Sequence, residues 1–165
     1  MYAFMIQGLP AHPLIVHGAV VGIPLSALAL LFYVLRPQSR AAWWNLVFGT
    51  MFVAWVFTLL AGSTGEDLEH ALKHSSLIED HTRLAGYLGV AVHVMSAAGA
   101  IMLLHDRFGA RLSGGLAGFG RFLRRIAPPI VVVAAIASLV LVALTGHAGA
   151  KAAWHDSPAA AANLK

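Results

Sequence analysis

The chain has 165 residues, of which 59% are hydrophobic and 11% are charged, and its formal net charge is +4. A soluble domain usually has about 25% charged residues, so this composition excludes a water-covered globular surface and indicates a chain solvated largely by lipid. The sequence contains no cysteine, which excludes disulfides, covalently attached haem, cysteine-ligated iron–sulfur clusters and thiol catalysis.

Four continuous apolar segments follow one another along the chain, and each is long enough to cross a bilayer as a helix. A helical span needs about 20 predominantly apolar residues. The segments cover residues 13–35, 42–61, 84–104 and 128–146. Pro128 and Pro129 are predicted to open the fourth helix, because proline is tolerated in the first turn. The fold class is therefore all-α: an integral membrane four-helix bundle that forms a single domain.

The connections between these segments differ sharply in charge. The first and third connections hold seven basic residues and one acid: Arg36, Arg40, Arg107, Arg111, Arg121, Arg124, Arg125 and Asp106. Basic loops stay in the cytoplasm, so the middle connection and both termini are predicted to lie on the non-cytoplasmic side. In a bacterium this makes the chain a multi-pass protein of the inner (cytoplasmic) membrane. Topology accounts for the basic residues, so the lipid bilayer is the expected partner and nucleic acid is not.

Two connections have features of their own. Residues 66–77 combine helical spacing of leucines with acids in the first turn, which favour the positive end of a helix dipole. This pattern predicts a short outer helix that caps the mouth of the bundle. Residues 108–126 alternate phenylalanines with arginines, which suits either a segment on the membrane surface or a basic loop that only sets topology.

Nine histidines are the main functional signal. Seven fall on the predicted outer side: His12, His17, His70, His74, His81, His147 and His155. The first, third and fourth helices each place a histidine at similar depth, and ionisable groups bordering a bilayer usually face the bundle interior. Ligands that converge from several helices form metal and haem sites. The predicted cofactor-binding residues are His17, His81, His147 and His12, and the first three are also predicted to bind a metal.

A b-type haem needs no cysteine and is commonly held by two axial histidines on facing helices. The inner halves of the other helices offer no partner for His105, so the sequence predicts one haem near the outer face. Imidazole also binds copper or zinc, and a single interfacial histidine is often only hydrogen-bonded at a helix end. Gly18 and Gly22 form a GxxxG motif, which predicts close helix packing.

The opening Gly-Leu-Pro-Ala-His12-Pro13-Leu-Ile-Val-His17 resembles the start of a bacterial family of small predicted membrane proteins of unknown function. Members have four helices and begin with a His-Pro-x-x-Val-His motif. The resemblance continues in His81 and in Thr145-Gly-His147-Ala-Gly, but Gly18-Ala stands where the family often has Phe-Pro. It implies a membrane domain similar in layout to b-type cytochrome membrane domains, and it carries His12, His17 and His81 over as site residues.

Three functions fit these observations. The first is a membrane electron-transfer subunit with one b-type haem near the outer face, which exchanges electrons with quinone and a periplasmic redox protein or larger membrane complex. The second is a haem-free copper or zinc binding membrane protein, and the third is a structural subunit of a respiratory complex. The sequence contains no nucleophile motif, phosphate loop, dinucleotide fingerprint or HExxH motif, so we expect no catalysis by the chain outside an oxidoreductase assembly.

Overall fold

The computed structural model of the protein describes residues 4–154. It has four long helices, a short hairpin before them and two short 3-10 helices. In chain order the elements are β1 (Met5–Ile6), β2 (Leu9–Pro10), α1 (Ala11–Leu35), η1 (Pro37–Ser39), α2 (Arg40–Ala71), α3 (Ser76–Phe108), η2 (Gly109–Arg111) and α4 (Gly114–Trp154). All four α-helices are long and apolar enough to cross a membrane, so the predicted all-α bundle of four membrane helices is confirmed.

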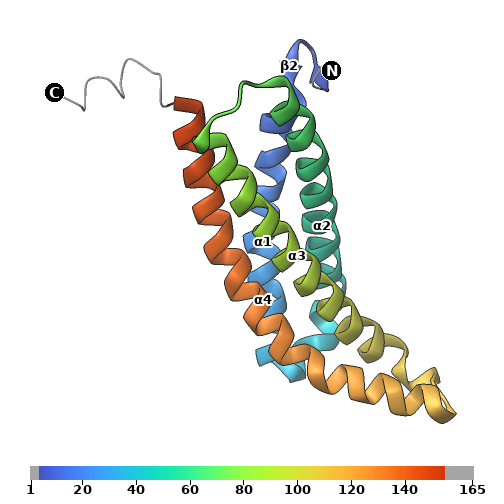
Figure 1. Cartoon of the computed structure of the whole chain (residues 1–165). Helices are drawn as coiled ribbons and strands as arrows, with labels where there is room; N and C mark the ends of the chain where they lie inside the picture. Colours follow the sequence, from blue (N-terminus) through green and yellow to red (C-terminus); the bar gives the residue numbers. More distant parts are fainter. Residues whose placement is uncertain (1–3, 155–165) are drawn as a thin grey trace.

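The helices form a four-membered ring in which α1 and α3 each pack against α2 and α4. As a result α1 and α3 stand diagonally across the bundle from each other. The start of α1, the connection of residues 72–75 and the end of α4 lie together at the top of Figure 1. We call this the histidine end, and we call the opposite end, where η1 and η2 lie, the arginine end.

The connection between α2 and α3 differs from the predicted one. No separate helix covers residues 66–77, because α2 continues without a break to Ala71 and α3 already begins at Ser76. The acids of this segment are compatible with a helix interior, and it contains no proline to stop α2. Ser75 starts the next helix, since its hydroxyl accepts a hydrogen bond from the Ile78 amide at 3.3 Å. The middle connection is therefore only four residues long.

The fourth helix also begins earlier than predicted. α4 starts at Gly114, so Pro128 and Pro129 lie inside it rather than at its beginning. A proline inside a helix removes a backbone hydrogen bond and bends the axis, and the helix changes direction in this region in Figure 1. Residues 114–126 thus form a helical arm at the arginine end, with Leu116 and Phe119 exposed.

A hairpin of two-residue strands precedes α1. Its loop residues, Gln7 and Gly8, both have positive φ, at 50° and 81°. This combination is typical of the tight turns whose twist matches that of antiparallel strands. The Ala11 amide donates to the Phe4 carbonyl at 2.9 Å. The hairpin therefore leads directly into the first turn of α1, where His12 lies.

The buried core is divided unequally between the two ends. The larger cluster lies in the half nearer the arginine end and includes Leu30, Met51, Met102 and Val131, one from each helix. The smaller cluster lies toward the histidine end and consists of Ala19, Ile23, Leu88 and Val92. The packing that stabilises the bundle is therefore concentrated away from the histidines.

The glycine motif of α1 is a packing site, as predicted. A side chain at Gly18 would collide with the Phe57 ring of α2, and a Cβ at Gly22 would lie 3.3 Å from the Ala54 Cα. These small residues allow the backbones of α1 and α2 to approach closely. They contribute to packing between two helices rather than to a cofactor surface.

We expect Gly22→Leu to destabilise the protein by about 1–3 kcal/mol, because the added side chain must push the α2 backbone away. Gly62→Leu is the matched control on α2, since a Cβ there has no neighbour within 4 Å. Unfolding of the two detergent-solubilised variants, followed by circular dichroism, measures the difference. Equal stability of the two variants would show that the α1–α2 approach tolerates a large side chain.

Candidate functional site

His12 lies in the first turn of α1 and is partly buried against α2. Its Nδ1 is 3.0 Å from the Ala61 carbonyl oxygen and 3.5 Å from the Thr64 hydroxyl. Gly65 makes room for the imidazole ring, since a Cβ at this position would lie 3.1 Å from the Cε1 atom of His12. A carbonyl oxygen only accepts hydrogen bonds, so the Nδ1 of His12 carries the proton and donates. The Nε2 atom then keeps its lone pair.

His81 has a similar environment on the other side of the bundle. It lies in the second turn of α3, partly buried against α4, with Nδ1 3.1 Å from the Thr145 carbonyl oxygen. Gly149 approaches this ring closely, since a Cβ there would lie 2.9 Å from Cε1. By the same argument, the Nδ1 of His81 donates and its Nε2 retains a lone pair.

The two imidazoles meet at the histidine end although their helices stand diagonally across the bundle. The ring centres are 6.4 Å apart and the ring planes cross at 76°. Metal–imidazole bonds of about 2.0 Å, with each ring centre about 1 Å behind its nitrogen, would place two axial ligands roughly 6 Å apart. The observed separation is close to this value. The donor chemistry and spacing of His12 and His81 are therefore those that two histidine ligands of one metal or haem iron would have.

The hydrogen bonds to Nδ1 resemble those found around metal sites. A histidine ligand usually donates its other ring N–H to a carboxylate, a backbone carbonyl or water, which fixes the tautomer and orients the ring. Ala61 and Thr145 supply such carbonyls for the two rings. In the neutral form of each ring, these hydrogen bonds select the tautomer whose Nε2 can bind a metal.

One further polar atom lies beside the pair. The hydroxyl of Thr145 is buried and has no hydrogen-bond partner within residues 4–154. The carbonyl of the same residue already accepts from His81. A buried hydroxyl without a partner is costly, so this atom is a candidate contact for a bound group.

The structure does not bring the other two predicted ligands into this site. His17 is exposed and its Nδ1 bonds to the Pro13 carbonyl within α1, while His147 is exposed on α4. Within the described part of the chain no three histidine or acidic side chains are close enough to hold a metal ion. Of the four predicted cofactor-binding residues, the structure brings His12 and His81 together, and it leaves His17 and His147 outside this pair.

The remaining histidines lie elsewhere. His70 ends α2 and His74 lies in the connection after it, both exposed, so they do not share one helical face. His93 bonds to the carbonyl of Gly89 in its own helix, and its ring lies against the Trp55 ring of α2. His105 lies near η2, and His155 lies outside the described residues.

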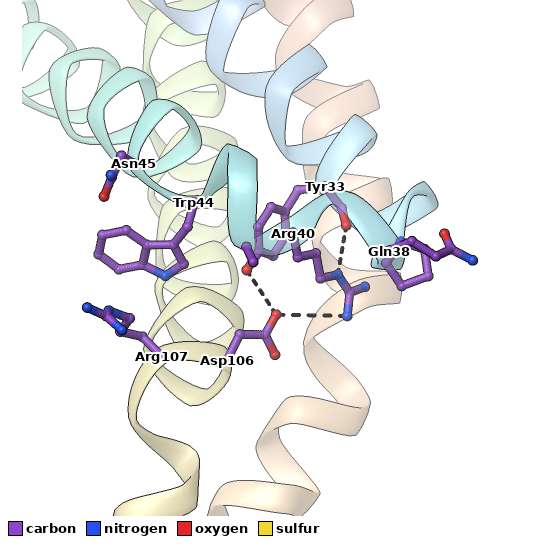
Figure 2. A pocket seen from close by; sticks show the side chains of 9 residues that line it. Tyr33, Gln38, Arg40, Trp44, Asn45, Asp106 and Arg107 are labelled. Atoms are coloured by element: carbon purple, nitrogen blue, oxygen red, sulfur yellow. Dashed lines mark hydrogen bonds and ion pairs between the residues drawn. The ribbon is translucent and has the colours of Figure 1, made fainter.

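A second polar cluster lies at the arginine end, and the sequence did not predict it as a site. Asp106 of α3 accepts from the Tyr33 hydroxyl at 2.9 Å and from Arg124 Nε at 2.8 Å. Arg40 lies 3.8 Å from the same carboxylate and stacks over the Tyr33 ring at 5.3 Å. Figure 2 shows Tyr33, Arg40 and Asp106 turned toward one another. The only signal in the sequence was a single acid among seven arginines.

This cluster connects all four helices. Tyr33 belongs to α1, Arg40 to α2, Asp106 to α3 and Arg124 to α4. The Asp106 side chain is only 22% exposed, so its interactions are less screened than those of a surface pair. Trp44 adds a further link, because its indole N–H donates to the Leu103 carbonyl at 2.8 Å. The arrangement is that of a structural joint that fixes the helix ends.

A family model whose description is "predicted membrane protein (DUF2231)" matches residues 8–161, which is nearly the whole chain. No match is found among the curated proteins or among the solved structures. The description agrees with the four helices that are long and apolar enough to cross a membrane.

Proposed function

The chain belongs to the family of predicted membrane proteins designated DUF2231, and from this premise we propose that it is a membrane electron-transfer protein that binds one b-type haem between His12 and His81. The observation that carries the proposal is the meeting of two half-buried imidazoles from diagonal helices, 6.4 Å apart. Both rings donate through Nδ1 to backbone carbonyls, which leaves both Nε2 atoms as ligands.

The number of ligands favours haem over zinc. A zinc site takes three or four protein ligands, whereas a haem iron needs only two axial ligands from the protein because the porphyrin supplies the others. The described residues offer a pair and no third histidine or acid beside it. The proposed haem ligands, His12 and His81, are therefore two of the four predicted cofactor-binding residues, and His17 and His147 are left out.

A haem held in this way would supply one-electron redox chemistry. The Ala61 and Thr145 carbonyls orient the two rings and increase their basicity as ligands. Gly65 and Gly149 let the rings lie close to α2 and α4. The Thr145 hydroxyl is available to donate a hydrogen bond to the bound group. These residues bind and orient the group, and no proton transfer is required of them.

The charge of the connections supports an assignment of the histidine end to one side of the membrane. Seven arginines lie in the connections of the arginine end, and this supports a cytoplasmic location for that end and a periplasmic location for the histidine end in a bacterial inner membrane. A haem near the outer face would be within reach of quinol in the bilayer and of a periplasmic redox protein or larger membrane complex. The proposal therefore places electron exchange at the outer surface of the membrane.

The direct test is an absorption spectrum of the purified protein in mild detergent, oxidised and then reduced with dithionite. We expect a Soret band, sharpened α and β bands on reduction, and about one extractable haem b per chain. Protein expressed with haem precursors that shows none of these features would contradict the proposal.

A single copper ion is the second candidate, because imidazole nitrogen also binds copper and two ligands can be enough for its reduced form. Metal analysis of the same preparation separates the two cases. One copper ion per chain and no haem would contradict the haem proposal. His12 and His81 would then be the proposed copper ligands.

A further inference from the structure

A polar pocket of about 650 Å³ opens at the arginine end, between η1, the start of α2 and the end of α3. Its lining includes Tyr33, Gln38, Arg40, Asn45, Asp106 and Arg107, whose side chains are drawn in Figure 2. The volume lies in the range of small-molecule sites. This pocket is at the opposite end of the bundle from the histidine pair.

The charges around the pocket favour an anion. Arg40 and Arg107 line it, and Arg124 binds the one acid, Asp106, so three positive charges and one negative charge give a net +2. The part of the chain that forms the arginine end has no second acid to offset this excess. A ligand that carries negative charge would be attracted here.

Two of the arginines have donors available for a ligand. Arg40 is held in place because Nε donates to the Tyr33 carbonyl at 2.9 Å and Nη2 to the Val34 carbonyl at 3.3 Å. Its Nη1 is 3.8 Å from Asp106, longer than a hydrogen bond, so this nitrogen can still donate. Arg107 forms no ion pair within residues 4–154 and stands only against the Phe108 ring. Arg40, which is held by backbone carbonyls, and Arg107, which is not ion-paired within residues 4–154, therefore both line this pocket.

An apolar groove adjoins this pocket. It has a volume of about 310 Å³, runs between α1 and α2, and is lined by Gly22, Leu25, Asn45, Leu46, Gly49, Thr50 and Val53. Asn45 lines both the pocket and the groove. From Asn45 to Val53 the groove follows eight residues of α2, which is about 12 Å along the helix. The charged pocket and the apolar groove together form one continuous site with a polar part and an apolar part.

We propose that this pocket and groove bind one anionic phospholipid, with its phosphate against Arg40 and Arg107 and part of one acyl chain in the groove. The occupant follows from the combination of features. A free phosphate would use the arginines but not the groove, and a zwitterionic lipid would gain less from the arginines, because its cationic headgroup offsets the charge of its phosphate. The arginine end is the cytoplasmic one by its charge, and anionic lipids of that leaflet attract basic residues near the membrane surface.

The test uses the purified full-length protein in neutral detergent, titrated with phosphatidylglycerol or phosphatidylcholine of matched chains and analysed by native mass spectrometry. We expect phosphatidylglycerol to bind more tightly than phosphatidylcholine, and Arg107→Gln to weaken its binding about 5-fold. Arg111→Gln is the matched control, because Arg111 also contacts the Phe108 ring but does not line the pocket. Equal effects of the two substitutions would overturn the headgroup assignment.

A second pair of variants tests whether an acyl chain lies in the groove. Gly49→Leu is expected to fill the groove and weaken binding of phosphatidylglycerol, whereas Gly62→Leu is expected to leave it unchanged. Both glycines lie on α2 and have no atom within 4 Å of an added Cβ. Inorganic phosphate is titrated as a competitor. Displacement of the lipid by millimolar phosphate, or unchanged lipid binding in Gly49→Leu, would mean that the site takes a free anion and would overturn the lipid proposal.

Discussion

His12→Ala and His81→Ala are each expected to abolish the haem spectrum of the purified protein. Each substitution removes one of two axial ligands and leaves the other imidazole without a partner across the bundle. His12 and His81 lie on α1 and α3, 6.4 Å apart between ring centres, so no neighbouring histidine on the same helix can replace either of them in the pair. The measurement is the absorbance ratio of the Soret band to the protein band after identical purification.

The controls for these substitutions come from the same end of the bundle. His17→Ala and His147→Ala remove exposed histidines of α1 and α4 that do not contact the pair, so their spectra should match the unmodified protein. Circular dichroism of all four variants shows whether the fold survives. Loss of haem in His17→Ala with retention in His12→Ala would contradict the proposed ligand assignment.

Asp106→Asn is expected to destabilise the protein by about 2–3 kcal/mol, because a hydrogen bond to a charged group contributes up to this amount. The substitution removes the negative charge that Arg40 and Arg124 share and weakens the acceptor for the Tyr33 hydroxyl. Tyr33→Phe should have a smaller effect of about 1 kcal/mol, since it removes one hydrogen bond. Unfolding in detergent by a denaturing surfactant, followed by circular dichroism, measures both effects.

Arg83→Gln is the matched control for the charge. It breaks the ion pair with Asp80, whose side chains are 58% and 55% exposed, so we expect a loss below about 1 kcal/mol. A loss in Asp106→Asn no greater than in Arg83→Gln would show that the four-helix cluster contributes no more than a surface pair.

The spans could be predicted from sequence because each is a continuous apolar run, and such a run crosses a bilayer regardless of its detailed packing. The ends of the helices could not be predicted from the sequence. α2 passes beyond the apolar segment to Ala71, because polar residues continue a helix in water as well as apolar ones do in lipid. Pro128 and Pro129 predict a helix start, although the preceding amphipathic residues are helical too. Hydropathy marks where a membrane ends rather than where a helix ends.

The histidine layer was predictable, but the choice among its members depended on side-chain direction. His17 follows His12 by five residues, which is a rotation of about 140° on a helix, so both could not face the same partner. His147 follows the buried Thr145 by two residues, or about 200°, and is therefore turned outward. Helical geometry thus excludes some combinations, while only the packing of α1 against α2 decides that His12 faces inward.

The Asp106 cluster marks the limit of sequence reasoning in another way. A lone acid among arginines predicts an ion pair, yet five possible partners lie within the same connection. The actual partners include Arg40 and Tyr33, which are more than sixty residues away in the chain. Long-range pairing of this kind follows from the order of helices in the ring, which the sequence does not specify.

The unequal division of the core has a consequence for motion. The arginine half combines the larger buried cluster with the charged joint at Asp106, whereas the histidine half has the smaller cluster and the imidazole–carbonyl contacts. Regions with few buried contacts open most readily. The four helices should therefore separate more readily at the histidine end than at the arginine end, which would let the proposed haem enter between His12 and His81 while the arginine end stays packed. Amide hydrogen exchange would then rise progressively from the arginine end toward the histidine end.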